Sequence, residues 1–288
     1  MINSILNHHK KKIVIDRLFT KEDDEFNLVL DEKIIKEKVN DHFQNVAIPK
    51  EYPNPISGRW SEQYKPKDYI DKNIYNNILA LPTMEEWMKV VNTLPNDKAC
   101  GPSGIYNEYI KHLDDSTQRL LLKLIQMIFT VGDIPTDWKS AFVYPIPKPT
   151  EWYYDISKTR PITLLETIRK AYVKILTNRL SKILQKHNIL RGNNFAGLPG
   201  KSTDEPIKMI NMLMEDAIEH NKELWILFQD LSKAYDRVNL QILTKALERI
   251  KLPSHLITMI INLFTDRRNS VFIVFGNTPQ YDIKIEID

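Results

Sequence analysis

The stretch WILFQDLSKAYDRV, residues 225–238, decides how the fold of this chain is interpreted. The apolar run from Leu224 to Phe228 is too short and too continuously apolar for a surface helix, so we predict a buried strand. The run stops at Gln229 and Asp230, and a helix-like pattern begins two residues later. A carboxylate that leaves a buried strand is costly unless a metal ion, a basic side chain or a helix N-terminus compensates it. Asp230 is therefore a candidate metal ligand, with capping of the next helix as the structural alternative.

The composition of the chain indicates a folded protein and excludes several classes. Of its 288 residues, 42% are hydrophobic and 27% are charged, which excludes a disordered chain. The net charge of +3 is too small to indicate nucleic-acid binding without local clusters. Cys100 is the single cysteine, so we expect no disulfide framework, no cysteine-rich zinc site and an intracellular location. No apolar stretch approaches the roughly 20 residues of a membrane span, and we expect no signal peptide.

Helical periodicity predicts most of the other elements. Thr83, with Glu86 three residues later, is a capping-box pattern at the start of a helix. Helices are predicted at 163–187, 205–219, 239–250 and 254–265. The proline-broken run AFVYPIPKP, residues 141–149, is predicted as an edge strand, and two β-like runs close the sequence. This order predicts an α+β domain, rich in helices, around a small sheet.

The first 75 residues are interpreted as a peripheral N-terminal segment and linker. They contain the charge runs HHKKK (8–12) and KEDDE (21–25), one candidate amphipathic helix at 32–43, and the proline-containing stretch EYPNPISGRW (51–60). The regular apolar pattern begins only after this segment. We therefore predict the folded domain over residues 76–288.

Basic side chains cluster between residues 148 and 201, where eleven Lys and Arg face only Glu151, Asp155 and Glu166. Several of these cations lie on the predicted 163–187 helix, away from its apolar stripe. A solvated helix face explains them, and so does a surface that follows a phosphate backbone. The aromatic side chains beside the cluster could stack on bases or belong to the core; they are Trp152, Tyr153 and Tyr154.

The stretch GLPGKST, residues 197–203, imitates the phosphate-binding loop of P-loop enzymes. That loop requires a glycine five positions before Gly200, and the residue there is Phe195. The preceding segment is polar and does not read as a buried strand. We therefore reject a P-loop ATPase.

Four blocks, in the same order, resemble reverse transcriptases of non-LTR retrotransposons. FQDLSKAYDRV resembles their first catalytic motif. The other three blocks are similar to family fingers blocks: KACGPSGI (98–105), VYPIPKP followed by TRPITLLETIRKAYVKILTNRL (159–180), and ILRGNNFAGLPGKST (189–203). The resemblance covers roughly residues 80–288. It implies the helix-rich fingers and a partial palm of a right-hand polymerase fold, and RNA-directed DNA synthesis.

The resemblance also implies roles for particular residues. Asp230 would bind the catalytic Mg²⁺ ions, and the backbone carbonyl of Leu231 would join one of them. Tyr235 would lie under the sugar of the incoming deoxynucleoside triphosphate and exclude a 2′-hydroxyl. Arg160, with Lys148 nearby, would contact the triphosphate, since a guanidinium suits bidentate phosphate contacts. Asp236 would brace the motif.

The implied partners are an RNA template and a DNA primer, with access to the nucleus. From the basic cluster, we expect Arg169, Lys174 and Arg179 to contact nucleic acid. Three positions depart from the family pattern near the expected template or primer contacts: Cys100 replaces a usual Pro, Ser103 a usual Asp, and Leu198 a common Arg. Template specificity and oligomeric state stay open.

Two-metal catalysis needs more carboxylates than Asp230 alone. In the family, an aromatic-x-Asp-Asp hairpin further along the chain supplies them. The pairs Asp23-Asp24 and Asp114-Asp115 do not follow an apolar strand, so neither fits that motif. We therefore expect a domain truncated before that hairpin and no polymerase activity for the isolated chain. The alternatives are a non-catalytic nucleic-acid-binding module, with salt-dependent affinity, and an inert pseudogene product, with poor solubility.

Overall fold

The computed structural model describes residues 15–22, 25–47, 56–149, 151–190, 195–197, 199–231, 234–235 and 238–283. The predicted features HHKKK, Leu198 and Asp236 lie outside these residues. The helices are α2 (Glu32–Ala47), α3 (Arg59–Gln63), η1 (Lys72–Tyr75), α4 (Met84–Asn92), α5 (Asn107–Lys111), α6 (Asp115–Val131), η2 (Thr136–Lys139), η3 (Ile156–Lys158), α7 (Thr167–Lys186), α8 (Asp204–Glu219), α9 (Leu240–Arg249) and α10 (Ser254–Asn262). The strands are β1 (Leu18–Glu22), β2 (Glu25–Val29), β3 (Ser140–Pro147), β4 (Thr159–Leu164), β5 (Arg267–Ile273), β6 (Gly276–Asn277) and β7 (Tyr281–Ile283). This mixture of helices and strands confirms the predicted α+β class.

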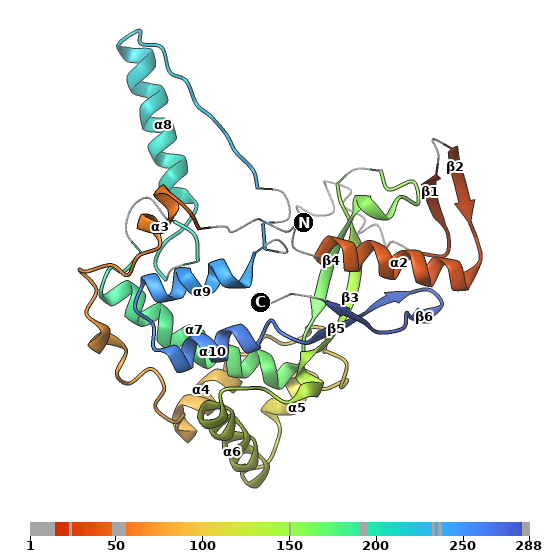
Figure 1. Ribbon diagram of the computed structural model, residues 1–288, viewed down its shortest axis with the longest axis horizontal. Helices are drawn as coiled ribbons and strands as arrows, with labels where there is room; N and C mark the ends of the chain where they lie inside the picture. The colour runs from red at the N-terminus through yellow and green to blue at the C-terminus, as the bar shows by residue number, and fades with distance from the viewer. Residues whose placement is uncertain are drawn as a thin grey trace.

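Helices α4, α6, α7 and α10 gather around the larger hydrophobic core (Figure 1). The fully buried Trp87 lies in this core and donates its indole N–H to the buried Gln118 Oε1 at 2.7 Å. Helix α4 begins at the predicted cap, because Thr83 Oγ1 accepts the backbone N–H of Glu86 at 3.2 Å. Within the part of the chain that the structure describes, no helix is long and apolar enough to cross a membrane.

The main sheet has the strand order β4-β3-β5-β6, with β7 also paired to β5. Strand β3 lies between β4 and β5, so its prediction as an edge strand is wrong. The parallel pairing with β5 covers only Ser140 to Val143. Both prolines of β3, Pro145 and Pro147, lie beyond that pairing, where a missing N–H costs no bond to β5. The proline pattern therefore predicts the second half of the strand correctly and the first half wrongly.

Helix α2 covers one face of this sheet (Figure 1). Its buried side chains Ile35, Val39 and Phe43 pack in a second hydrophobic core with the sheet. Asn40 and Gln44 donate to backbone carbonyls next to and within β7, at 2.9 and 3.0 Å. The helix predicted at 32–43 is thus confirmed, and it belongs to the same core as the sheet although the sequence places it in a peripheral segment.

The segment after α8 differs most from the prediction. Residues 222–231 form no strand in the structure, and Trp225 and Leu227 are each 89% exposed. Figure 1 shows α8 projecting from the body and this segment returning from its tip as an extended trace. A strand is stable only when its backbone groups pair in a ladder, and no described strand pairs with this segment. The prediction of a buried strand at Leu224 to Phe228 is therefore wrong for this structure.

Candidate nucleotide and nucleic-acid site

Asp230 lies at the end of the extended segment, and its side chain is exposed. Leu231 and Tyr235 are exposed as well, at 68% and 95%. Among the described residues, no group of three His, Cys, Asp or Glu side chains lies close enough to hold a metal ion. The described donors near Asp230 therefore do not form a complete metal site, and we derive no catalytic step through a metal.

Two cavities lie on opposite faces of the sheet. The first, of about 380 Å³, lies on the face that α2 covers; Val143, Pro161 and Thr163 line it, and Tyr235 reaches it. Arg160 alternates with Pro161 along β4, so its side chain belongs to the other face. The structure therefore does not bring together Arg160 and Tyr235, the two residues predicted to hold the nucleotide.

The second cavity, of about 590 Å³, is an apolar groove on the face to which Arg160 belongs. Phe142, Tyr144 and Ile162 are among its lining residues. The rings of Tyr144 and Phe272 stack across β3 and β5, with centroids 5.9 Å apart and planes inclined by 26°. A broad aromatic surface beside a cation is suited to unpaired bases.

The turn of the KACGPSGI block forms one wall of this groove, and Glu166 holds it in place. The buried Glu166 carboxylate accepts the backbone N–H of Ser103 at 2.7 Å and its hydroxyl at 2.5 Å. Next to it, Thr167 Oγ1 donates to the carbonyl of Ile105 at 2.5 Å. An aspartate in place of Ser103 would put a second carboxylate against Glu166, so the departure from the family pattern has a local reason. Cys100, the second departure, lines the groove.

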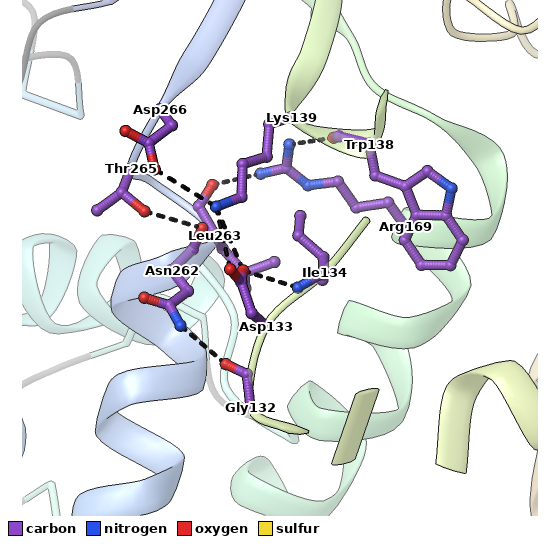
Figure 2. Close-up of polar contacts among 10 residues, drawn as sticks. All are labelled: Gly132, Asp133, Ile134, Trp138, Lys139, Arg169, Asn262, Leu263, Thr265 and Asp266. Carbon is purple, nitrogen blue, oxygen red and sulfur yellow. Dashed lines mark hydrogen bonds and ion pairs between the residues drawn. The ribbon is translucent and has the colours of Figure 1, made fainter. Parts of the chain in front are cut away.

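Arg169 points into the protein and does not reach the surface. Its side chain is buried, and its two Nη atoms donate to the carbonyls of Trp138 at 2.8 Å and Leu263 at 2.6 Å (Figure 2). Burial, together with the nearby Arg267, lowers the pKa of Arg169 to about 10, so the group stays charged at neutral pH. The expected nucleic-acid contact of Arg169 does not fit this position, because its buried guanidinium donates hydrogen bonds to two backbone carbonyls.

Lys139 is a second buried cation near Arg169, and no pattern in the sequence predicts its burial. Its ammonium lies 3.3 Å from Asp133 and 3.6 Å from Asp266 (Figure 2). Asn262 adds a hydrogen bond of 2.9 Å to the carbonyl of Gly132. Together with Arg169, these contacts fix the point where β3 and β5 begin side by side. A lone lysine before a strand carries no sequence signal of burial.

Arg179 and Lys174 also have partners inside the chain. Arg179 forms a bidentate ion pair with Glu86, at 2.8 and 2.5 Å, and donates to the carbonyls of Ile78 and Ala80. Lys174 donates to the carbonyl of Thr93 at 3.1 Å. The Glu86 carboxylate therefore binds Arg179 of α7 instead of completing the capping box. A nucleic-acid role for Lys174 and Arg179 stays a prediction.

Replacing Arg179 with alanine is expected to lower the free energy of unfolding by about 2 kcal/mol, since hydrogen bonds to charged groups are worth about 1.5–3 kcal/mol each. Lysine should recover little, because it lacks the planar fork that meets Glu86. Urea unfolding measures both variants, with the exposed Lys186→Ala on the same helix as control. An Arg179→Ala chain as stable as the control would show that the ion pair is only a surface contact.

Lys148 lies at the end of the β3–β4 pair. Its ammonium donates to the carbonyl of Ser157 at 2.7 Å, and its backbone N–H donates to the carbonyl of Lys158 at 2.9 Å. Arg160 thus lies in this strand pair and Lys148 directly follows it, while Asp230 and Tyr235 belong to the exposed segment.

Comparison with known proteins defines the class. Residues 146–281 match the family model described as reverse transcriptase (RNA-dependent DNA polymerase). The chain is 27% identical over 180 residues to the probable RNA-directed DNA polymerase from transposon BS of Drosophila melanogaster, an alignment that covers 62% of this chain and 20% of that protein. The polymerase from the mobile element jockey of the same species is 26% identical over 174 residues, covering 60% and 19%. Residues 146–281 therefore match part of a reverse transcriptase domain.

The relatives also define the subtype. A Pol polyprotein from the type-1 retrotransposable element R2 of Nasonia vitripennis is 23% identical over 176 residues, covering 61% of this chain and 16% of the relative. Together with transposon BS and jockey, it shows that this segment is similar to reverse transcriptases of non-LTR retrotransposons. The chain spans about a fifth of the length of the curated relatives it matches.

Proposed function

We propose that residues 76–288 form the fingers and the first part of the palm of an RNA-directed DNA polymerase from a non-LTR retroelement. The observation that carries the proposal is the stretch FQDLSKAYDRV inside the segment that matches the reverse transcriptase family. The substrates are deoxynucleoside triphosphates, with an RNA template and a DNA primer. The apolar groove beside Arg160 supports the template strand, with its bases against Tyr144 and Phe272.

We propose Asp230 and the carbonyl of Leu231 as one side of a Mg²⁺ site that nucleotide phosphates help to complete. Mg²⁺ prefers one or two carboxylates plus substrate phosphates, so a single carboxylate is compatible with nucleotide-dependent binding. Arg160 and Lys148 contact the triphosphate, and Tyr235 lies against its sugar. Because Arg160 and Tyr235 lie on opposite faces of the sheet, this arrangement requires the segment from residue 222 to be repositioned when nucleotide binds.

The 288-residue chain by itself is proposed to bind nucleotide and template without polymerising. Two-metal chemistry needs carboxylates beyond Asp230, and the sequence contains no aromatic-x-Asp-Asp motif after an apolar strand. Primer extension by the purified chain in Mg²⁺ that disappears in Asp230→Ala would overturn this part of the proposal.

Binding of a labelled deoxynucleoside triphosphate, in Mg²⁺ and in EDTA, tests the site. Asp230→Asn is expected to weaken the Mg²⁺-dependent affinity by about tenfold or more, because loss of even an outer-shell partner of a metal costs about 10–100-fold. Asp282→Asn, an exposed aspartate on β7, is the matched control. In Tyr235→Ala, the preference for deoxynucleotides over ribonucleotides should shrink. RNA binding that depends on salt, with no nucleotide binding and no response to Asp230→Asn, would favour the non-catalytic binding module.

A further inference from the structure

The three consecutive aromatic side chains between β3 and β4 have different surroundings. Trp152 and Tyr154 are half-buried, with ring centroids 5.6 Å apart, and Trp152 packs against the second hydrophobic core. Tyr154 also contacts the N-terminal hairpin: its ring lies 6.2 Å from that of Phe19, and its carbonyl accepts the Phe19 N–H at 3.0 Å. Tyr153 is 62% exposed. Packing therefore accounts for Trp152 and Tyr154 and leaves Tyr153 unexplained.

The backbone that presents Tyr153 is unfavourable for a tyrosine. Tyr153 and Tyr154 both have positive φ, at 41° and 58°. Two consecutive non-glycine residues in the left-handed region persist only when their surroundings impose that conformation. The contacts of Tyr154 and the hydrogen bond from the N–H of Asp155 to the carbonyl of Trp152, at 2.8 Å, hold this turn. The turn keeps the Tyr153 ring in solvent, where glycine or asparagine would suit the backbone better.

Cations adjoin the exposed ring. Lys158 Nζ lies 5.1 Å from the centroid of Tyr153, within the range of a cation–π contact. Lys148 reaches the carbonyl of Ser157 next to it. Of the two carboxylates in this loop, Asp155 accepts the backbone N–H of Ser157, and Glu151 is exposed. An exposed aromatic face flanked by lysines is complementary to a base and its phosphates.

We propose that Tyr153 is a stacking platform for one base of a single-stranded nucleic acid, with Lys158 and Lys148 beside the adjoining phosphates. A duplex is excluded, because its bases are already stacked and their faces are closed. Tyr153 lines neither of the two cavities, so the proposal is independent of the nucleotide site at Asp230. It adds a contact surface at the tip of the β3–β4 pair.

Binding of labelled single-stranded RNA, single-stranded DNA and duplex DNA in EDTA tests the proposal without the metal site. Tyr153→Gly is expected to weaken binding of both single strands by about fivefold to a hundredfold, the range for loss of one base–aromatic contact, and to leave duplex binding unchanged. Tyr153→Phe keeps the ring and should bind like the parent chain. Tyr109→Ala removes a tyrosine of matched exposure, 61%, and is the control.

The melting temperature separates a ligand contact from a packing role. Glycine adopts positive φ freely, so Tyr153→Gly should melt at the same temperature as the parent chain or higher. Single-strand affinities of Tyr153→Gly equal to those of the parent would overturn the proposal. So would an equal loss of duplex binding, or a loss of binding that comes with a lower melting temperature, since either would assign Tyr153 a general or structural role.

Discussion

Replacing Arg169 with alanine is expected to lower the free energy of unfolding by about 3 kcal/mol, because charge-assisted hydrogen bonds are lost and a cavity is left behind. The guanidinium bonds the carbonyls of Trp138 and Leu263, which belong to segments far apart in the sequence. Leu263 is the C-cap of α10, where a cation is favourable because the last helical carbonyls carry partial negative charge. Without Arg169, both carbonyls stay buried and lose their donor.

Two companion variants separate these contributions in urea unfolding. Arg169→Met fills most of the volume and removes only the hydrogen bonds, so about two thirds of the loss should remain. Lys186→Met, on an exposed position of the same helix, should stay within about 0.5 kcal/mol of the parent chain. If Arg169→Met is as stable as the parent chain, the two carbonyl contacts make no net contribution to stability, because the cost of desolvating the cation offsets them.

The sequence predicted the features that depend on neighbours along the chain. The cap at Thr83 needs only the N–H of Glu86, three residues away. The helix predicted at 163–187 follows from its own apolar period and is observed at Thr167–Lys186, because residues 163 and 164 belong to β4. Local patterns of this kind need no knowledge of the rest of the fold. They also sufficed for the family resemblance of residues 146–281, because the motifs are contiguous blocks.

Features that depend on distant partners were missed or misplaced. Arg169 resembles any cation on a helix until Trp138 and Leu263 meet it, 31 and 94 residues away. The position of β3 inside the sheet depends on β5, more than 120 residues later along the chain. The apolar run at residues 224–228 has the composition of a strand, yet no described strand pairs with it through backbone hydrogen bonds. The two residues predicted to hold the nucleotide also depend on distant partners. Arg160 lies in a paired strand, Tyr235 does not, and the structure places them apart.

Replacing Gly101 with alanine is expected to destabilise the chain by about 2–3 kcal/mol, the range for overpacking a close contact. A Cβ at Gly101 would lie 2.7 Å from backbone atoms of Leu165 and Glu166. Backbone cannot turn aside as the end of a side chain can, so the turn must move away from the N-terminus of α7. That movement stretches the bonds from Ser103 to Glu166 and removes one wall of the apolar groove.

Ser103→Ala is the matched control, because it removes the hydroxyl bonds to Glu166 and from the Ile105 N–H without adding an atom near Leu165. It should cost about 1.5 kcal/mol, the low end for a hydrogen bond to a charged group, because Glu166 keeps its bond from the Ser103 backbone N–H. Urea unfolding measures the stability of both variants, and the affinity for template in EDTA shows whether the groove is intact. Gly101→Ala should then lose both stability and affinity, whereas Ser103→Ala should keep most of each. Equal stabilities for the two variants would mean that the turn can move away from α7 at little cost. That result would contradict the claim that the KACGPSGI block forms a rigid wall of the groove.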